Sequence, residues 1–461
     1  MTLRFYVAAR PLNMMGDGMR RDLEQQLVKW KTGGSHQPLF LLGPRHTGKT
    51  YTVRKFAEEH YSDYVEINLE QDAFYRNLFE QTHDPGMIMQ QISSRKTDGR
   101  ISSDALIFID EIQASPQVLT TLKFMREEWS QDVIVTSSMP ETAIAKTSSF
   151  PVGSVKTMYM YPMTFLEFLQ AYGIERSLID VLFNAVTTLK PLNEFTHERM
   201  NQLFREYILC GGMPAVVKQY VQTGRYSREV LDVQRQIRSD YGNDIARYAL
   251  GSEKNRVREC YGSIPAQLAK DNHKFQYKLV RKGYGAREYD GSIEWLVNSG
   301  LVLKTISVNA VRSPLEAYED LSSFKLYASD TGVLLASLND TSVIEFSRST
   351  MSEYQEYIFE NAAAEILKAH AKPLYYYAPD QNMEIEFIVP YLGTLAPLEI
   401  KSGRHSASAS FTRFVKEQKP EYAFRLSMRN LGYDAEQHIT YMPLYLLDFL
   451  LRVEEQNDPL R

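Results

Sequence analysis

The stretch that decides the fold is Pro38–Thr50, which reads PLFLLGPRHTGKT. Its opening residues form a short apolar run of the kind that makes a buried parallel strand. Residues Gly43–Thr50 then follow the spacing G-x-x-x-x-G-K-[ST] of a phosphate-binding loop, or P-loop. Beyond the loop, Val53, Phe56 and Ala57 share one face of a helix. The order of strand, loop and helix is the one a P-loop requires, which favours this motif over a chance match.

Each fixed residue type in this loop has a chemical reason. Gly43 and Gly48 allow the backbone to curl so that its N–H groups point at phosphate oxygens. The start of the following helix adds the positive end of its dipole. We expect Lys49 to reach the β- and γ-phosphates of ATP and the Thr50 hydroxyl to bind Mg²⁺. The predicted nucleotide-binding residues are Gly43, Pro44, Arg45, His46, Thr47, Gly48, Lys49, Thr50 and Tyr51.

A second motif supplies the carboxylates that a P-loop needs. Leu106–Ile109 is a four-residue apolar strand, and Asp110 and Glu111 follow it. Ligands in open α/β sheets bind at the carboxyl ends of the strands, so Asp110 is predicted to hold Mg²⁺. Glu111 is predicted to orient or deprotonate the attacking water. The alternative is that both acids only cap the next helix.

A polar residue that follows the next strand is a candidate sensor of the γ-phosphate. Val133–Val135 reads as a strand, and Thr136, Ser137 and Ser138 come directly after it. Ser138 is the first candidate for the catalytic contact and Thr136 the second. A plain turn remains an alternative, because Ser and Thr are common in turns.

Composition narrows the class of protein. The chain has 461 residues, a net charge of −5, 44% apolar and 24% charged residues, which are ordinary globular values and exclude a wholly basic nucleic-acid coat protein. Cys210 and Cys260 can form at most one disulfide and no four-thiolate zinc site. We expect no signal peptide, no transmembrane helix and a cytoplasmic location, because no apolar stretch is long enough.

The pattern changes after Pro162. A helical lid on the α/β block is predicted from four segments, Thr164–Tyr172, Ser177–Leu189, Phe195–Leu209 and Pro214–Val221, and another long helix is predicted at Tyr226–Leu250. The tail is predicted to begin with one helix, Tyr354–Ala371. Three strands are predicted to follow it, at Tyr375–Tyr377, Ile385–Val389 and Leu398–Ile400. Pro443–Val453 is predicted to be a buried strand or a short helix.

At these motifs the chain resembles AAA-plus ATPases, and more narrowly a large family of prokaryotic two-part ATPases whose second half is a domain of unknown function. The resemblance runs nearly end to end and rests on GPRHTGKT, LIFIDEIQ, Tyr161–Phe165, Gly211–Pro214, Lys325–Gly332 and the tail pattern. It implies a P-loop AAA-plus parallel sheet with a helical lid at 1–225, a winged-helix region at 226–345, and a restriction-endonuclease-like, or PD-(D/E)XK, α/β domain at 346–461.

The chain departs from that family at two places. Ser154 follows Gly153, where the family often has an arginine, and Lys156 lies two residues further on. In this family such an arginine could serve as an arginine finger, which stabilises the transition state of hydrolysis. Without it, the sequence does not show which residue would take that role. His46 stands where the family often has glutamine.

Two regions carry further chemistry. Lys270–Arg287 holds six cations and two tyrosines, which fits a DNA-contacting face or a solvated basic loop. In the tail, strand alternation places Glu399 and Lys401 on one face, with Glu386 and the helical Glu360 expected nearby. These four residues resemble a PD-(D/E)XK nuclease site, although Glu386 replaces the usual aspartate and would disturb Mg²⁺ geometry.

The sequence thus predicts an ATP-binding AAA-plus ATPase with Mg²⁺-dependent hydrolysis coupled to a nucleic-acid or partner-protein interaction. The alternatives are a slow nucleotide-gated switch and an ATP-dependent DNA nuclease. Candidate partners are ATP, DNA and a partner protein, with no membrane; an oligomer is compatible with the sequence.

Overall fold

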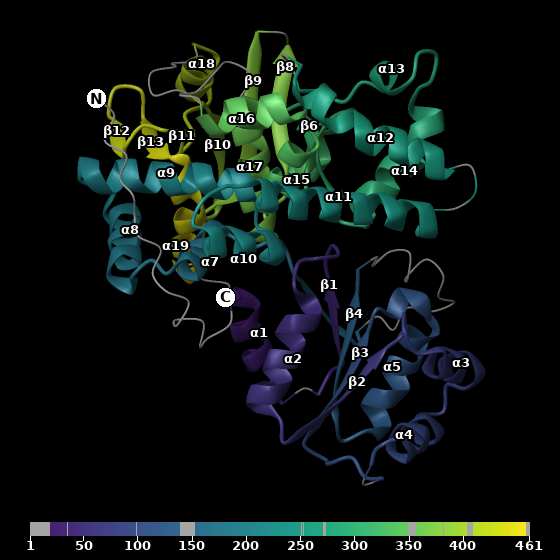
Figure 1. The fold of residues 1–461 in the computed structure, drawn as a ribbon. Helices are drawn as coiled ribbons and strands as arrows, with labels where there is room; N and C mark the ends of the chain where they lie inside the picture. Colours follow the sequence, from purple (N-terminus) through teal and green to yellow (C-terminus); the bar gives the residue numbers. More distant parts are fainter. Residues whose placement is uncertain are drawn as a thin grey trace.

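The computed structural model describes residues 19–34, 36–97, 99–138, 153–249, 251, 253–270, 273–348, 356–380, 382–402 and 409–457. Its N-terminal sheet forms one body, and the helices and larger sheet that follow form a second (Figure 1). Within these residues no helix is both long and apolar enough to cross a membrane. Cys210 and Cys260 are both buried and form no disulfide.

The first sheet has five strands, all parallel, in the order β2-β3-β4-β1-β5. Its strands are β1 (Leu39–Leu42), β2 (Asp63–Asn68), β3 (Ala105–Asp110), β4 (Asp132–Ser137) and β5 (Lys156–Tyr159). The strands predicted before the P-loop, at Leu106–Ile109 and at Val133–Val135 are confirmed as β1, β3 and β4. The sequence did not predict β5, because only Met158 in it is buried and no apolar run marks it.

Both faces of this sheet are covered by helices. α1 (Asp22–Thr32) and α2 (Lys49–His60) share one apolar core with Leu39, Leu41 and Phe108. α3 (Ala73–Gln81), α4 (Pro85–Ser94) and α5 (Gln117–Glu128) share the other core, with Phe40 and Ile107. Neighbouring residues of one strand thus point to opposite faces, which explains why β1 is apolar throughout and β3 is apolar up to its last residue, Asp110.

The helices predicted as a lid are present. They are α7 (Phe165–Tyr172), α8 (Arg176–Thr188), α9 (Glu194–Cys210) and α10 (Pro214–Thr223), and the further long helix predicted at Tyr226–Leu250 is α11 (Arg228–Tyr248). Their apolar faces, however, belong to a single core that runs from Met163 to Leu451 and includes the C-terminal sheet. Only part of this layer reaches the P-loop, through α10 and α11 (Figure 1). The lid is therefore built into the second body rather than packed only on the first sheet.

Three helices and a hairpin follow. They are α12 (Glu253–Leu268), α13 (Tyr277–Val280), α14 (Ala286–Asn298), β6 (Val302–Val308) and β7 (Glu319–Ala328). The two strands pair antiparallel, and β6 also pairs in parallel with β8 of the tail. The hairpin is thereby part of the C-terminal sheet.

That sheet has eight strands in the order β12-β13-β11-β10-β9-β8-β6-β7. The tail contributes α15 (Thr331–Ala336), α16 (Asp340–Arg348), α17 (Glu356–Ala369), β8 (Tyr375–Asp380), β9 (Met383–Tyr391), β10 (Thr394–Ile400), α18 (Ala409–Gln418), β11 (Phe424–Ser427), β12 (Gly432–Asp434), β13 (Ile439–Pro443) and α19 (Leu447–Asn457). The predicted helix Tyr354–Ala371 is α17, and its first two residues lie outside the described ranges. The apolar segment Pro443–Val453 begins at the last residue of β13, passes through a 3₁₀ turn at Leu444–Leu446 and continues as α19, so of the two alternatives it is mainly the helix.

Two motifs that are distant in sequence meet in the middle of the second body. Asp330 accepts a hydrogen bond from the Gly212 N–H at 2.7 Å and caps α15 by accepting one from the Val333 N–H at 2.8 Å. Gly211 has φ +72°, and a Cβ there would overlap the Asp330 carboxylate. These contacts explain why position 211 needs a glycine and why position 330 needs a carboxylate.

Candidate nucleotide-binding site

The P-loop joins β1 to α2 at the carboxyl edge of the first sheet. Gly43 has φ +145° and Gly48 has φ +96°, conformations that side chains disfavour. A Cβ on Gly43 would overlap the backbone oxygen of Met160, so glycine is required there for space as well. His46 also has a positive φ, of 71°. The loop therefore has the tight curvature that the motif predicts.

Lys49 is buried and lies against the loop itself. Its Nζ donates hydrogen bonds to the carbonyl oxygens of Gly43 at 2.8 Å and Pro44 at 2.9 Å, and to Ser138 Oγ at 3.2 Å. Burial lowers the pKa of Lys49 to about 8, and the charges of Glu111 and Asp110 oppose that decrease. An anion at this position would restore the charged form, which suits a phosphate-binding lysine.

Thr50 and Asp110 lie together, as expected for a metal-binding pair. The Thr50 hydroxyl donates to Asp110 Oδ2 at 2.9 Å, and Asn68 Nδ2 donates to the same oxygen at 3.2 Å. The Thr136 hydroxyl donates to Asp110 Oδ1. Burial raises the pKa of Asp110, and the neighbouring Glu111 adds to the increase. The Thr50 hydroxyl and the buried Asp110 carboxylate offer only oxygen atoms as ligands, which is the type of ligand that Mg²⁺ prefers.

Glu111 lies at the same edge, and its side chain faces the sensor position. It accepts hydrogen bonds from Ser138 Oγ at 3.1 Å and from Gln113 Nε2 at 2.5 Å. It has a left-handed backbone, with φ +58°, and its side chain caps no helix. The capping alternative is not supported, because a short 3₁₀ turn, Ile112–Ala114, and no α-helix begins directly after it. Ser138 bridges Lys49 and Glu111, whereas Thr136 contacts Asp110.

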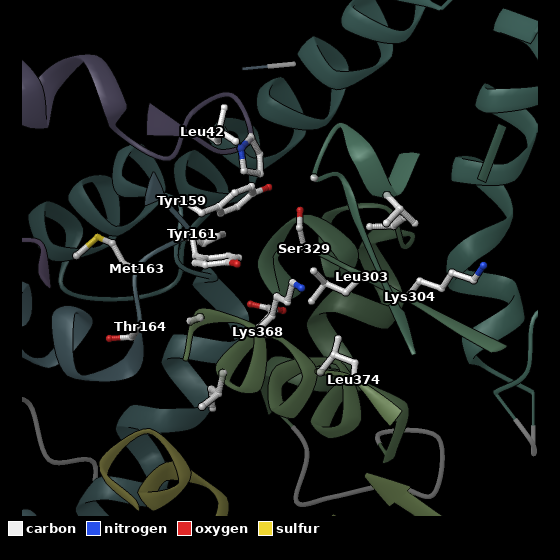
Figure 2. Close-up of a pocket in the computed structure, with 18 of the residues that line it drawn as sticks. Leu42, Tyr159, Tyr161, Met163, Thr164, Leu303, Lys304, Ser329, Lys368 and Leu374 are labelled. Carbon is white, nitrogen blue, oxygen red and sulfur yellow. The ribbon is translucent and has the colours of Figure 1, made fainter. Parts of the chain in front are cut away.

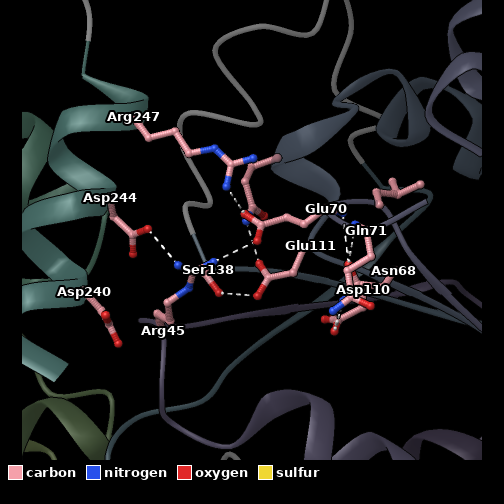
Figure 3. A network of polar contacts seen from close by, with 12 residues as sticks. Arg45, Asn68, Glu70, Gln71, Asp110, Glu111, Ser138, Asp240, Asp244 and Arg247 are labelled. Carbon is pink, nitrogen blue, oxygen red and sulfur yellow. Dashed lines mark hydrogen bonds and ion pairs between the residues drawn. The ribbon is translucent and has the colours of Figure 1, made fainter. Parts of the chain in front are cut away.

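Arg45 and His46 of the loop reach across to α11, and Figure 3 shows the contact that Arg45 makes there. Arg45 forms ion pairs with Asp244 at 2.9 Å and with Glu70 at 3.0 Å. His46 Nε2 lies 2.9 Å from an oxygen of Asp240. Burial raises the pKa of Asp244 to about 6, partly offset by Arg45, and burial lowers the pKa of His46. The P-loop is thus held from outside its own domain.

Two of the remaining predicted residues, Thr47 and Tyr51, differ in burial. Thr47 is buried, and its hydroxyl donates to the Pro44 carbonyl at 2.9 Å. Tyr51 is 53% exposed and lies in the first turn of α2. Arg21, which precedes α1, donates to the Thr47 carbonyl at 2.6 Å and pairs with Glu167 at 3.0 Å. Sequence reasoning missed the Arg21 contacts, because the partners of Arg21 lie far away along the chain.

A cavity of about 340 Å³ lies behind the P-loop, between the two bodies (Figure 2). Pro44, Tyr159 and Tyr161 line it from the first body, and Ser329 and Lys368 from the second. Burial lowers the pKa of Lys368. The junction behind the loop is therefore not closely packed.

The tail residues that resemble a nuclease site also lie near one another. Lys401 Nζ donates to Glu386 Oε1 at 3.3 Å and to Glu356 Oε1 at 2.6 Å. Glu399 is buried and accepts a hydrogen bond from Arg425. Burial raises the pKa of Glu386 to about 8, and its Oε2 is buried without a partner.

Glu360 faces cations of its own. It accepts hydrogen bonds from Lys325 at 3.2 Å, Tyr327 at 2.7 Å and the His273 ring at 2.9 Å. Lys325 is fully buried and also pairs with Glu384 at 2.6 Å. Among the described ranges no cluster of three or more histidine, cysteine or acidic residues could hold a metal ion.

Comparison with protein families agrees with the N-terminal site. Residues 35–169 match a family described as an AAA domain, and residues 356–447 match a domain of unknown function (DUF4143). Residues 201–343 match another domain of unknown function (DUF8612). The chain therefore carries an AAA domain of the P-loop ATPase type and a C-terminal DUF4143 domain.

Solved structures give more distant likenesses. A Walker-type ATPase of Pyrococcus abyssi is 14% identical, with a TM-score of 0.44, over 71% of this chain and 98% of that one. The ORC1 protein of Aeropyrum pernix, solved in complex with DNA, is 13% identical, with a TM-score of 0.27, over 70% of this chain and 92% of that one. No curated protein matches the chain.

Proposed function

We propose that the chain binds ATP with Mg²⁺ and hydrolyses it at the P-loop. The observation that carries this proposal is one cluster of side chains at the carboxyl ends of β1, β3 and β4, joined by hydrogen bonds in two adjoining groups, Lys49–Ser138–Glu111 and Thr50–Asp110. Its members are Lys49, Thr50, Asp110, Glu111 and Ser138. A phosphate-binding lysine, two metal-binding oxygens, an acid and a hydroxyl are the parts that phosphoryl transfer to water needs.

Each of these residues has a distinct role. Lys49 exchanges the carbonyls of Gly43 and Pro44 for the β- and γ-phosphate oxygens. Thr50 and Asp110 would hold Mg²⁺, which offsets the phosphate charge when bound. Glu111 accepts a proton from the attacking water, and Ser138 fixes its carboxylate beside Lys49.

Two variants test the proposal. Lys49→Ala should weaken ATP binding more than about tenfold by calorimetry, or 1.4 kcal/mol and above. Glu111→Gln should retain ATP binding and lose most turnover, because it keeps the size of the side chain and removes the base. Lys55→Ala, on the same helix as Lys49, is the control and should change neither. Unchanged nucleotide affinity in Lys49→Ala would refute the assignment of the site.

A slow nucleotide-gated switch is the second candidate. It is supported by the ion pairs that hold Arg45 to Asp244 and place His46 beside Asp240, since ATP must compete with both contacts. α11 leads into α12, α13, α14 and the β6–β7 hairpin, an order of elements that fits the winged-helix region implied by the resemblance, although the hairpin pairs with the C-terminal sheet. DNA that raises ATPase turnover severalfold would favour coupled hydrolysis; turnover that stays slow with and without DNA would favour the switch.

The basic segment Lys270–Arg287 remains the proposed DNA-contacting face. Part of its charge is already neutralised, since Arg281 forms an ion pair with Glu259 at 2.8 Å. Binding of a duplex oligonucleotide that falls in a Lys278→Ala and Lys282→Ala protein would support this role, and unchanged binding would leave only a solvated loop.

For the tail we propose a nuclease-like fold that does not cut DNA. Its support is that Arg425 binds Glu399 and Lys325 binds Glu360, so protein cations neutralise two of the carboxylates that a metal ion would need. Plasmid incubated with the protein, ATP and either Mg²⁺ or Mn²⁺ should stay intact. Cleavage that disappears in both Glu399→Ala and Lys401→Ala proteins would contradict this proposal.

A further inference from the structure

A groove on the second body carries charge that nothing above accounts for. It lies between α11, α12 and the residues just after α15, and its volume is about 520 Å³. Arg235, Arg238 and Arg258 line it, together with Tyr261 and Ser337. We call this feature the arginine groove.

The groove holds more positive charge than its surroundings balance. Arg235 pairs with Asp340 at 2.5 Å, and Arg228 already pairs with the other oxygen of that carboxylate at 2.6 Å. Arg238 and Arg258 have no ion pair or hydrogen bond with any residue in the described ranges. Two guanidinium groups, of the exposed Arg258 and the half-buried Arg238, therefore line one cavity without a protein partner among the described residues.

The rest of the lining leaves room for a ligand. Gly242 on α11 and Gly262 on α12 also line the groove, and a Cβ at either position would meet only open space. Tyr261, Leu338 and Ile245 add an aromatic ring and apolar surface beside the arginines. Cavities of about 300–1,000 Å³ suit small molecules, so the size of the groove fits a compact ligand.

The groove is separate from the P-loop although one helix serves both. Arg235, Arg238 and Gly242 follow the spacing i, i+3 and i+7 and share one face of α11. Asp240 and Asp244 point from the other side of the helix to the P-loop. A ligand in the groove therefore does not overlap the nucleotide site.

We propose that the arginine groove binds a small phosphorylated ligand through its phosphate groups. Guanidinium groups present paired N–H donors that match phosphate oxygens, and unpaired arginines gain more from such an anion than lysines would. The phosphates lie against Arg238 and Arg258, and the rest of the ligand packs on Tyr261 and the apolar lining. This site does not depend on ATP hydrolysis at the P-loop.

Calorimetry with inorganic pyrophosphate tests the proposal. The measurements use Lys49→Ala protein, because the intact P-loop would bind the probe itself. Arg238→Gln with Arg258→Gln should weaken pyrophosphate binding at least tenfold. The matched control is Arg176→Gln with Arg413→Gln, two arginines that are 79% and 46% exposed on α8 and α18, and it should bind as the parent does.

Hydrogen exchange locates the bound probe. Pyrophosphate should slow exchange at residues 235–245 and 258–262 but not at residues 43–50. Arg238→Lys with Arg258→Lys keeps the charge and should restore part of the affinity. Equal affinity in the groove and control variants, protection confined to the P-loop, or absence of binding would each overturn the proposal. An oligonucleotide that binds only through these arginines, while pyrophosphate does not bind, would overturn it in favour of a nucleic-acid strand.

Discussion

The contact between Arg45 and Asp244 should hold the P-loop back from its nucleotide. Asp244→Asn keeps the shape of the side chain and removes its charge. Arg45 then keeps only its ion pair with Glu70 and becomes freer to reach phosphate oxygens. ATP should therefore bind more tightly to Asp244→Asn protein than to the wild type.

The size of the effect follows from burial. The Asp244 side chain is 3% exposed and that of Arg45 is 25% exposed, so the pair is only partly screened by water. A hydrogen bond to a charged group contributes about 1.5–3 kcal/mol. The lower end applies here, since Arg45 is partly exposed and retains Glu70. About 1.4 kcal/mol corresponds to a tenfold decrease in the Kd for ATP.

Calorimetry on four proteins separates this contact from a general change of charge. The set is wild type, Asp244→Asn, Arg45→Gln and the double variant, titrated with a non-hydrolysable ATP analogue and Mg²⁺ at pH 7.5. The loss of one negative charge near a polyanion would act in either background, whereas loss of the ion pair acts only when Arg45 is present. Asp244→Asn should therefore tighten binding much less in the Arg45→Gln background.

The pH dependence supplies an independent check. Burial raises the pKa of Asp244 from 3.8 to about 6, so the wild type carries the charge at pH 7.5 and loses most of it at pH 5. The difference in affinity between wild type and Asp244→Asn should vanish as the pH falls through 6. A wild type that binds ATP as tightly as Asp244→Asn at pH 7.5, or a difference that persists at pH 5, would refute the reasoning.

Three further predictions concern other parts of the chain. Ser138→Ala should lower turnover at least about tenfold with little change in ATP affinity, because its hydroxyl positions the catalytic acid; steady-state kinetics with calorimetry would show it, and an equal loss of both would contradict it. Glu386→Gln should make stability depend less on pH. Burial raises the pKa of Glu386 in the folded protein from 4.5 to about 8, so the free energy of unfolding of the wild type falls by up to about 1.4 kcal/mol per pH unit between these values. Thermal melts at pH 5–9 would show this fall in the wild type and a smaller one in the variant. Gly211→Ala should lower the melting temperature by about 5 °C or more, because its Cβ meets Asp330; Gly224→Ala, with φ +65° and open space around it, is the control, and equal effects would mean that backbone strain alone is responsible.

The sequence was most informative where function rests on local geometry. The P-loop, the acid pair after β3 and the polar residues after β4 are each contained in a run of a few residues. A parallel sheet brings the carboxyl ends of its strands to one edge, so order along the chain was enough to place Lys49, Asp110 and Ser138 together. The same reasoning found α7 to α11 and α17 of the second body, since each buries one apolar face.

Only the tertiary structure decided what those helices pack against. An apolar stripe along a helix indicates that this face is buried, but it does not indicate which surface covers it. In this protein the lid helices share a core with the C-terminal sheet. The two bodies also supply residues to one another: Arg45 meets Asp244 across 199 positions, and Arg21 meets Glu167 across 146. Single charged residues carry no mark of such partners, because an ion pair depends on position in space and not on spacing in the chain.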